Sequence, residues 1–144
     1  MKLLLNAVLM ISLALMVTPQ TIQELVRECK KTVPISAEQE KSFLELKFPP
    51  EEKTTHCLMR CIGSTLQVFN DETGIDLPVI KTMLKGVQES SDGEFTEDQV
   101  KCVEAAETKG EAKEEDECMM AFRAYQCFEQ EFLALMKKDL EQGQ

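Results

Sequence analysis

Residues 56–62 read HCLMRCI, and the two cysteines in this stretch, Cys57 and Cys61, constrain the fold more than any other residues. The stretch lies in a longer segment, Glu51 to Phe69, whose apolar residues recur at helical spacing. Two cysteines four positions apart on a helix share a face about 40° wide, and such neighbours rarely bond each other. We therefore expect each cysteine to bond a different segment, so that this helix is tied to two others.

The first twenty residues have the pattern of a secretory signal peptide. Lys2 is their only charged residue, and Leu3 to Val17 is almost entirely apolar. This run is shorter than the roughly 20 apolar residues of a membrane-spanning helix, so we do not favour the alternative of a retained membrane anchor. We expect residues 1–20 to be removed, with cleavage between Thr18 and Thr21, and residues 21–144 to form a single secreted, extracellular domain.

Secretion gives the cysteines a specific meaning. All six lie in the expected mature part, at Cys29, Cys57, Cys61, Cys102, Cys118 and Cys127. An even number of cysteines in an oxidising compartment predicts three disulfides. A metal site formed by Cys57, Cys61 and His56 is the alternative, but it would leave four cysteines unexplained and places His56 beside a cysteine rather than one turn away. We therefore expect no metal.

Charge and composition exclude several classes of function. The chain has 26 acidic and 16 basic residues, for a formal net charge of -10. Nucleic acids and anionic membrane surfaces bind clustered basic residues, so we expect neither as a partner and no stable membrane insertion. The chain has one histidine and lacks the motifs Gly-x-Ser-x-Gly, His-Glu-x-x-His and a phosphate-binding loop. We therefore expect no enzymatic activity and no cofactor.

The spacing of apolar residues, without strict two-residue alternation, predicts an all-α domain of about six helices. The expected helices run from Thr21 to about Val33, from Ser36 to before Pro49, from Glu51 to Phe69, from Leu77 to Val87, from Thr96 to about Thr108 and, with one break, from Asp116 to Leu140. Between them we expect a turn at Asn70–Gly74, a loop at Ser90–Gly93 and a loop or helix start at Gly110–Glu117. In the last helix, Cys118 and Cys127 are about two and a half turns apart, so they face opposite sides.

The cysteines follow the order Cys29-x27-Cys57-x3-Cys61-x40-Cys102-x15-Cys118-x8-Cys127, which covers nearly the whole mature chain. This order resembles the six-cysteine signature of the insect odorant-binding proteins, the pheromone- and general-odorant-binding family. The resemblance implies the disulfides Cys29–Cys61, Cys57–Cys118 and Cys102–Cys127. The gap of 15 residues is long for the family, and because the surplus coincides with the acidic stretch Glu111–Glu117, we expect a longer surface loop there.

The resemblance also implies a central hydrophobic cavity that the disulfides help to keep open. Nine residues are candidates for its wall: Phe43, Met59, Ile62, Leu66, Met83, Phe122, Tyr125, Phe128 and Phe132. Met59 lies between Cys57 and Cys61, and Phe128 follows the last cysteine, where members of the family often have a pocket residue. For each residue taken alone, ordinary core packing is the alternative. The hydroxyl of Tyr125, the only tyrosine, either orients a polar end of the ligand or reaches water.

The function that the resemblance implies is transport. The expected protein is secreted, binds small hydrophobic molecules such as odorants or pheromones in the internal cavity, and carries them through aqueous fluid to receptors. Its expected partners are the small hydrophobic ligand and an olfactory receptor, and a homodimer is a further candidate. The alternative is a non-olfactory lipid or small-molecule carrier on the same scaffold, in seminal fluid, saliva or haemolymph. A secreted helical protein that binds other proteins is a further class.

Overall fold

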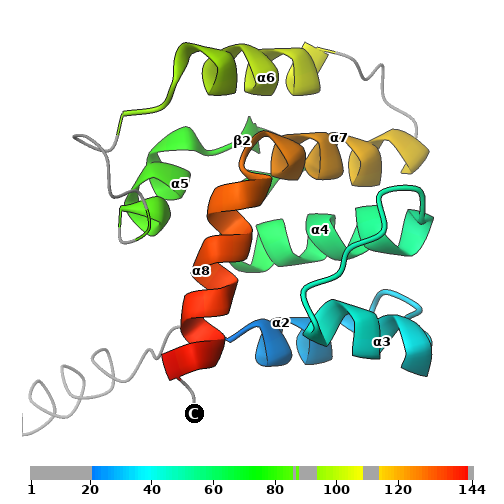
Figure 1. Ribbon diagram of the computed structural model, residues 1–144. Helices are drawn as coiled ribbons and strands as arrows, with labels where there is room; N and C mark the ends of the chain where they lie inside the picture. Colours follow the sequence, from blue (N-terminus) through cyan, green and yellow to red (C-terminus); the bar gives the residue numbers. More distant parts are fainter. Residues whose placement is uncertain (1–20, 86, 88–93, 109–113, 143–144) are drawn as a thin grey trace, which may run out of the picture.

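The computed structural model describes residues 21–85, 87, 94–108 and 114–142. Within these residues it contains seven helices and one short antiparallel hairpin, which confirms the all-α class and adds the hairpin to it. The elements are α2 (Ile22–Cys29), α3 (Ala37–Leu44), α4 (Lys53–Thr65), β1 (Phe69–Asn70), β2 (Gly74–Ile75), α5 (Leu77–Leu84), α6 (Glu97–Thr108), α7 (Glu114–Cys127) and α8 (Glu129–Gln142) (Figure 1).

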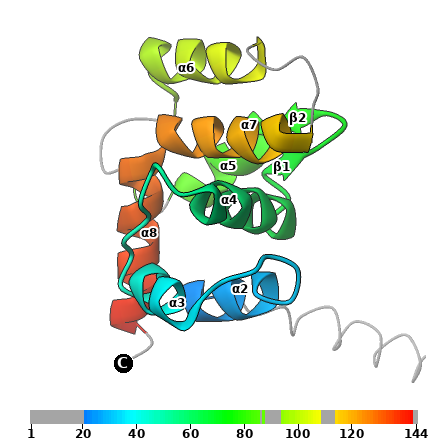
Figure 2. The same ribbon diagram turned by 90° about the vertical axis from the view of Figure 1, so that its right-hand side faces the viewer.

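Four helices form successive layers, in the order α6, α7, α4 and α2 (Figures 1 and 2). α3 lies beside α2 in the bottom layer, and α8 runs across the layers at one end of the stack. α5 packs against α8, and the hairpin packs against both α4 and α6. The layered helices therefore form a stack, and α5 and the hairpin are attached to its side.

Each pair of neighbouring layers is joined by one disulfide. The three bonds are Cys29–Cys61 between α2 and α4, Cys57–Cys118 between α4 and α7, and Cys102–Cys127 between α7 and α6. They are the pairs that the resemblance implies, and Cys57 and Cys61 bond different segments, as their spacing predicts. Because both of these thiols are used in disulfides, they cannot ligate a metal together with His56, and that alternative is wrong.

The helix starts follow signals in the sequence. The Gln39 backbone N–H donates to the Ser36 hydroxyl over 3.1 Å, and the Ser36 N–H donates to the Gln39 side chain over 3.0 Å, which together form a capping box at the start of α3. Thr96 and Gln99 form the same reciprocal pair at the start of α6. Thr21 forms a capping box at the start of α2.

The end of α4 differs from the prediction. The sequence predicts a helix that reaches Phe69, but α4 ends at Thr65 because Gln67 adopts the left-handed conformation, with a φ of 60°. The Val68 N–H then bonds the Gly63 carbonyl, which closes the helix as in a Schellman motif. Glycine is the usual residue at such a position, so glutamine gives no warning of the helix end in the sequence.

The predicted turn at residues 70–74 is the tip of the hairpin. Phe69 pairs with Ile75, and Asn70 pairs with Gly74. The Asn70 side-chain oxygen accepts from the Glu72 N–H over 2.8 Å, which is an Asx turn. Gly74 has a φ of 79°, a conformation that glycine adopts without a steric penalty. The chain therefore reverses direction here, so that β1 contacts α4 and β2 contacts α6.

The long apolar segment at the C-terminal end forms two helices, α7 and α8, with Phe128 between them. The predicted single break is thereby confirmed. α7 begins at Glu114, so the surface loop predicted over residues 111–117 is wrong for its second half. Acidic residues are favoured in the first turn of a helix because they interact with its dipole. Residues 109–113, the predicted loop at 90–93 and the predicted signal peptide lie outside the described residues.

The buried apolar residues form two clusters. The larger cluster joins α2, α3, α4, α7 and α8. The smaller one contains Ile80 and Leu84 of α5, Val103 of α6 and Phe128. In the parts of the chain that the structure describes, none of the helices combines the length and the apolar character needed to cross a bilayer.

Candidate functional site

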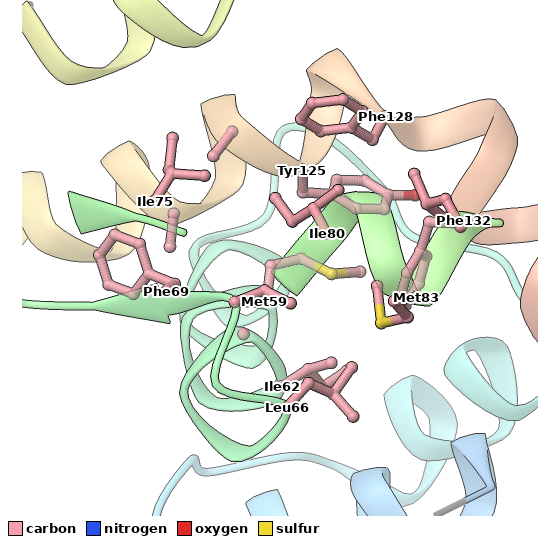
Figure 3. Close-up of a pocket in the computed structure, with 15 residues that line it drawn as sticks. Met59, Ile62, Leu66, Phe69, Ile75, Ile80, Met83, Tyr125, Phe128 and Phe132 are labelled. Carbon is pink, nitrogen blue, oxygen red and sulfur yellow. The ribbon is translucent and has the colours of Figure 1, made fainter. Parts of the chain in front are cut away.

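An apolar pocket lies where the two clusters meet, with α4 and α7 on one side and the hairpin and α5 on the other (Figure 3). Its cavity volume is about 70 Å³. The pocket is lined by Met59, Ile62, Gly63, Leu66, Val68, Phe69, Ile75, Ile80, Met83, Leu84, Ala121, Ala124, Tyr125, Phe128 and Phe132.

The side of the pocket formed by α7 combines small and aromatic residues. Ala121, Ala124 and Tyr125 follow the spacing i, i+3 and i+4, so they share one face of α7, and Phe128 comes directly after the end of this helix. The two alanines are buried, with exposed fractions of 5% and 8%. Their short side chains leave unfilled the space between α7 and its neighbours, and the cavity occupies this space.

The side formed by α4 depends on a close approach of backbones. Met59 and Ile62 point into the pocket from α4 (Figure 3), and Gly63 follows them. A Cβ atom at Gly63 would lie 3.0 Å from the Cβ of Phe69 in β1. The glycine therefore allows the hairpin to pack directly against α4 and to close this part of the pocket.

The opposite side of the pocket comes from segments that contain no cysteine. The hairpin region contributes Phe69 and Ile75, and α5 contributes Ile80, Met83 and Leu84. The Asp76 side chain caps α5 by accepting from the Val79 N–H over 3.2 Å. Ile75 and Met83 are only partly buried, so this side of the pocket lies next to solvent.

The structure brings together most of the residues predicted for the cavity wall. Seven of the nine line the pocket: Met59, Ile62, Leu66, Met83, Tyr125, Phe128 and Phe132. Phe43 and Phe122 do not. Phe43 is fully buried in α3 and stacks on Phe48, with ring centroids 5.8 Å apart. Phe122 lies about 100° around α7 from Ala121, and its ring packs against His56, 4.5 Å between centroids. That the seven residues contact a ligand stays a prediction.

Sequence reasoning missed eight lining residues: Gly63, Val68, Phe69, Ile75, Ile80, Leu84, Ala121 and Ala124. The two alanines could have been predicted from the sequence, because their helical spacing places them on the same face as Tyr125. The residues from 68 to 75 had none, since the sequence predicts a helix and then a turn in the region where the hairpin forms.

Tyr125 has a defined environment. Its ring contacts those of Phe132, Phe122 and Phe48, with centroids 5.4, 5.8 and 6.2 Å away, and the contacts with Phe132 and Phe48 are edge-to-face. Its hydroxyl lies 3.5 Å from a carboxylate oxygen of Glu129. Burial, followed by the charge of Glu129 and the hydrogen bond to it, raises the pKa of Tyr125 above its ordinary value. Tyr125 is therefore a neutral phenol at physiological pH.

The pocket can bind by shape and apolar contact. A cavity of this volume costs roughly 2 kcal/mol of stability, at about 24 cal/mol per Å³. One disulfide contributes about 2–4 kcal/mol, so the cross-links are sufficient to offset the cavity. An apolar lining offers water few hydrogen-bond partners, and an apolar molecule that fills the pocket restores the missing van der Waals contacts.

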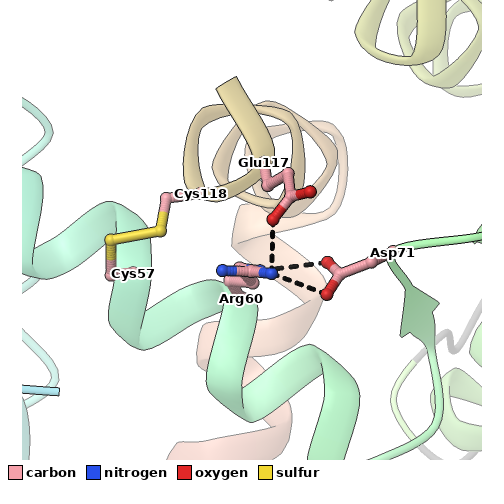
Figure 4. The surroundings of a disulfide bond; sticks show 5 residues. All are labelled: Cys57, Arg60, Asp71, Glu117 and Cys118. Atoms are coloured by element: carbon pink, nitrogen blue, oxygen red, sulfur yellow. Dashed lines mark hydrogen bonds and ion pairs between the residues drawn. A yellow bond between two sulfur atoms is a disulfide. The ribbon is translucent and has the colours of Figure 1, made fainter. Parts of the chain in front are cut away.

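A second hollow has a more polar lining than the first. A groove of about 410 Å³ lies beside the Cys57–Cys118 disulfide, and Arg60 and Asp71 are part of its lining. Arg60 donates to both carboxylate oxygens of Asp71, over 3.0 and 2.6 Å, and also to Glu117 (Figure 4). Ligand sites for small molecules are mostly apolar and concave, so the pocket between α4 and α7 is the better candidate.

Comparisons with known proteins agree with this architecture. The sequence pattern of the PBP/GOBP family matches residues 16–131. Odorant-binding protein 22 of Aedes aegypti is 27% identical over 125 residues, which are 86% of this chain and 83% of that protein.

Solved structures show the same similarity in three dimensions. The crystal structure of Anopheles gambiae odorant-binding protein 22a with the bound odorant cyclohexanone superposes with a TM-score of 0.61 at 28% identity, covering 81% of this chain and 95% of that one. A crystal structure of the same mosquito protein in an open status for ligand binding gives a TM-score of 0.59 at 29% identity, covering 75% and 88%. The family pattern spans most of the chain, so this protein belongs to the PBP/GOBP family.

Proposed function

We propose that the protein is a secreted carrier that binds a small hydrophobic molecule, such as an odorant, and delivers it through aqueous fluid to a receptor. The observation that carries this proposal is the apolar pocket that has α4 and α7 on one side and the hairpin and α5 on the other. The proposal assigns no catalytic step to the site, and it gives the disulfides the role of keeping the pocket open.

The relatives support this role. A mosquito protein with the same fold binds the odorant cyclohexanone, a small ketone. In the present chain, transfer of apolar ligand surface from water into the pocket would contribute about 25 cal/mol per Å². After the costs of association, we expect dissociation constants on the order of micromolar. Such an affinity suits a carrier, because it allows both loading and release.

Secretion fits the same proposal. The cross-links between the layers require an oxidising compartment to form and persist. The first capping residue of the described chain is Thr21, so cleavage between residues 18 and 21 would leave α2 with its N-terminal cap. Detection of the mature N-terminus by mass spectrometry of the secreted protein tests this part of the proposal.

Filling the cavity with a larger side chain tests whether the pocket is the ligand site. Ala124 is buried and lines the pocket, so the variant Ala124→Leu places its added atoms in the cavity. We expect this variant to lose affinity for an apolar fluorescent probe by at least tenfold, without any loss of thermal stability, because filling a void restores packing contacts. Probe titration measures the first effect, and thermal unfolding measures the second.

The control is Ala134→Leu, which adds the same atoms at an exposed position on α8. It should bind the probe as the wild type does. Equal binding by wild type and Ala124→Leu would mean that the probe occupies another place on the protein, and the proposal would then be wrong.

A further inference from the structure

Tyr125 differs in chemistry from every other residue that lines the pocket. The other lining residues described above have aliphatic, phenyl or thioether side chains, or are glycine. Tyr125 is therefore the one residue with a side-chain O–H or N–H group among the lining residues that the structure describes. In Figure 3 the ring of Tyr125 lies among the lining residues and its hydroxyl is directed toward Phe132.

This hydroxyl is weakly engaged within the protein. Its acceptor is a carboxylate oxygen of Glu129, one helical turn further along, at 3.5 Å. Hydrogen bonds between hydroxyl donors and oxygen acceptors are usually about 2.5–3.0 Å long, so this one is long and weak. A ligand oxygen closer to the hydroxyl would be a better acceptor than Glu129.

The ring that carries the hydroxyl is already fixed in position. Three rings contact it: Phe48 from the connection between α3 and α4, Phe122 from α7, and Phe132 from α8. A ligand therefore does not have to order this side chain when it binds, and the conformational cost of the new hydrogen bond is low. Because the phenol stays protonated at physiological pH, it acts as a donor there.

We infer that the pocket selects neutral molecules that carry one hydrogen-bond acceptor, such as ketones, aldehydes, esters or ethers, and that the Tyr125 hydroxyl donates to this acceptor. The inference rests on the proposed function, since it assumes that the pocket is the ligand site. The lining offers no cation to a carboxylate and no second donor to a strongly polar molecule, so a charged or strongly polar group enclosed by the pocket would lose its hydration without compensation.

The test compares two ligands of one shape in two proteins. Cyclohexanone and methylenecyclohexane differ in an oxygen and a CH₂ group, and Tyr125→Phe removes the hydroxyl but keeps the ring. We expect Tyr125→Phe to bind cyclohexanone about fivefold more weakly than the wild type, which corresponds to ~1 kcal/mol. Its affinity for methylenecyclohexane should stay the same. Titration calorimetry measures all four affinities.

Glu129→Gln is the matched variant, because it keeps the Tyr125 hydroxyl and weakens the acceptor that competes with the ligand. It should retain the preference for the ketone. Infrared spectroscopy adds a direct readout: the carbonyl stretch of bound cyclohexanone should lie at a lower frequency in the wild type than in Tyr125→Phe. In wild type alone, the carbonyl stretch should also lie below that of the ketone in an alkane solvent, which tests the inference even if the variant does not fold.

The outcomes separate the inference from the proposed function. Equal affinity of wild type and Tyr125→Phe for the ketone, or an equal loss for both ligands, would overturn the role of the hydroxyl while leaving the pocket as the binding site. Tight binding of cyclohexanecarboxylate by the wild type would overturn the selection of neutral ligands. If neither neutral ligand binds the wild type, the proposed function itself fails.

Discussion

The wall formed by α4 and α7 and the wall formed by the hairpin and α5 face each other across the same cavity, but they are held in place differently. α4 and α7 are bonded to each other by Cys57–Cys118, and each is bonded to a further helix. The hairpin and α5 fall within the 40 residues that separate Cys61 from Cys102, so no disulfide reaches them. One wall therefore depends on covalent bonds and the other on packing and polar contacts.

The polar contacts of the hairpin are few and specific. Arg60 of α4 binds Asp71 near the hairpin tip (Figure 4), and the Ile75 N–H donates to the Glu107 carboxylate of α6 over 3.2 Å. These two contacts attach the hairpin to two cross-linked helices. The comparison teaches that the disulfides constrain only one of the two walls, so the position of the opposite wall depends on weaker contacts that substitutions can change.

The largest effect should come from breaking the cross-linked wall. In the double variant Cys57→Ser with Cys118→Ser, no free thiol remains from this bond. We expect the free energy of unfolding to fall by about 2–5 kcal/mol, because the bond joins segments 61 residues apart. Urea denaturation measures the loss. A loss below about 1 kcal/mol is within the range of ordinary substitutions. Such a loss, together with unchanged ligand affinity, would show that packing alone holds this wall.

A smaller effect should come from straining the hairpin with Gly74→Ala. An alanine at a φ of 79° costs about 1–2 kcal/mol, and its Cβ would lie 2.9 Å from a Glu107 carboxylate oxygen. The Glu107 side chain would move away and give up its hydrogen bond to Ile75. Thermal unfolding should show the destabilisation, and hydrogen exchange should rise first at Ile75.

Thr73→Ala is the control for this change, because Thr73 is the exposed neighbour in the same turn. Its effect should stay within about 0.5 kcal/mol, as for ordinary surface substitutions. Equal effects of the two substitutions would mean that the hairpin tolerates strain and is not a defined wall.

The smallest effect should come from Arg60→Gln. Arg60, Asp71 and Glu117 are partly exposed, with side-chain fractions of 31%, 42% and 35%, so water and salt weaken their attraction. We expect a loss of about 0.5–1 kcal/mol that shrinks as the salt concentration rises. Ligand dissociation should become faster, because the hairpin is less firmly attached to α4. Stopped-flow displacement of a fluorescent probe measures this rate.

The matched variant is Lys101→Gln, which removes an ion pair with Glu97 on the exposed surface of α6, away from the pocket lining. It should leave the dissociation rate unchanged. If both substitutions change the rate equally, the effect reflects overall charge, and the attachment of the hairpin by Arg60 is not what retains the ligand.

Much of the fold was predictable because its signals are local. The capping box at Ser36 and the single break near Phe128 follow from neighbouring residues. The resemblance in cysteine spacing supplied the disulfide pairs. The end of α4 was not predictable, because Gln67 adopts the left-handed conformation at a position where glycine is the usual residue. Leu46, after α3, has the same φ of 60°, and leucine gives no sign of it in the sequence.

The candidate site was predictable in part. Large apolar residues on α4 and α7 are natural candidates for either a core or a cavity wall. Met59 and Tyr125 are two such residues that line the pocket. Phe43 and Phe122 have the same sequence character, yet they pack in the core. The alanines at 121 and 124 matter because they are small, and a search for large apolar residues passes over them.

The sequence by itself determined the helical class, the supply of apolar side chains and, through the spacing of its cysteines, the family framework of cross-links. Those properties arise from neighbours along the chain or from a pattern that the whole chain carries. Only the tertiary structure decided which helix faces border the void, that the hairpin closes one side of it, and that Tyr125 is among the residues that line it. The physical reason is that a cavity is the space left between segments far apart in sequence, so its shape depends on how all of them pack together.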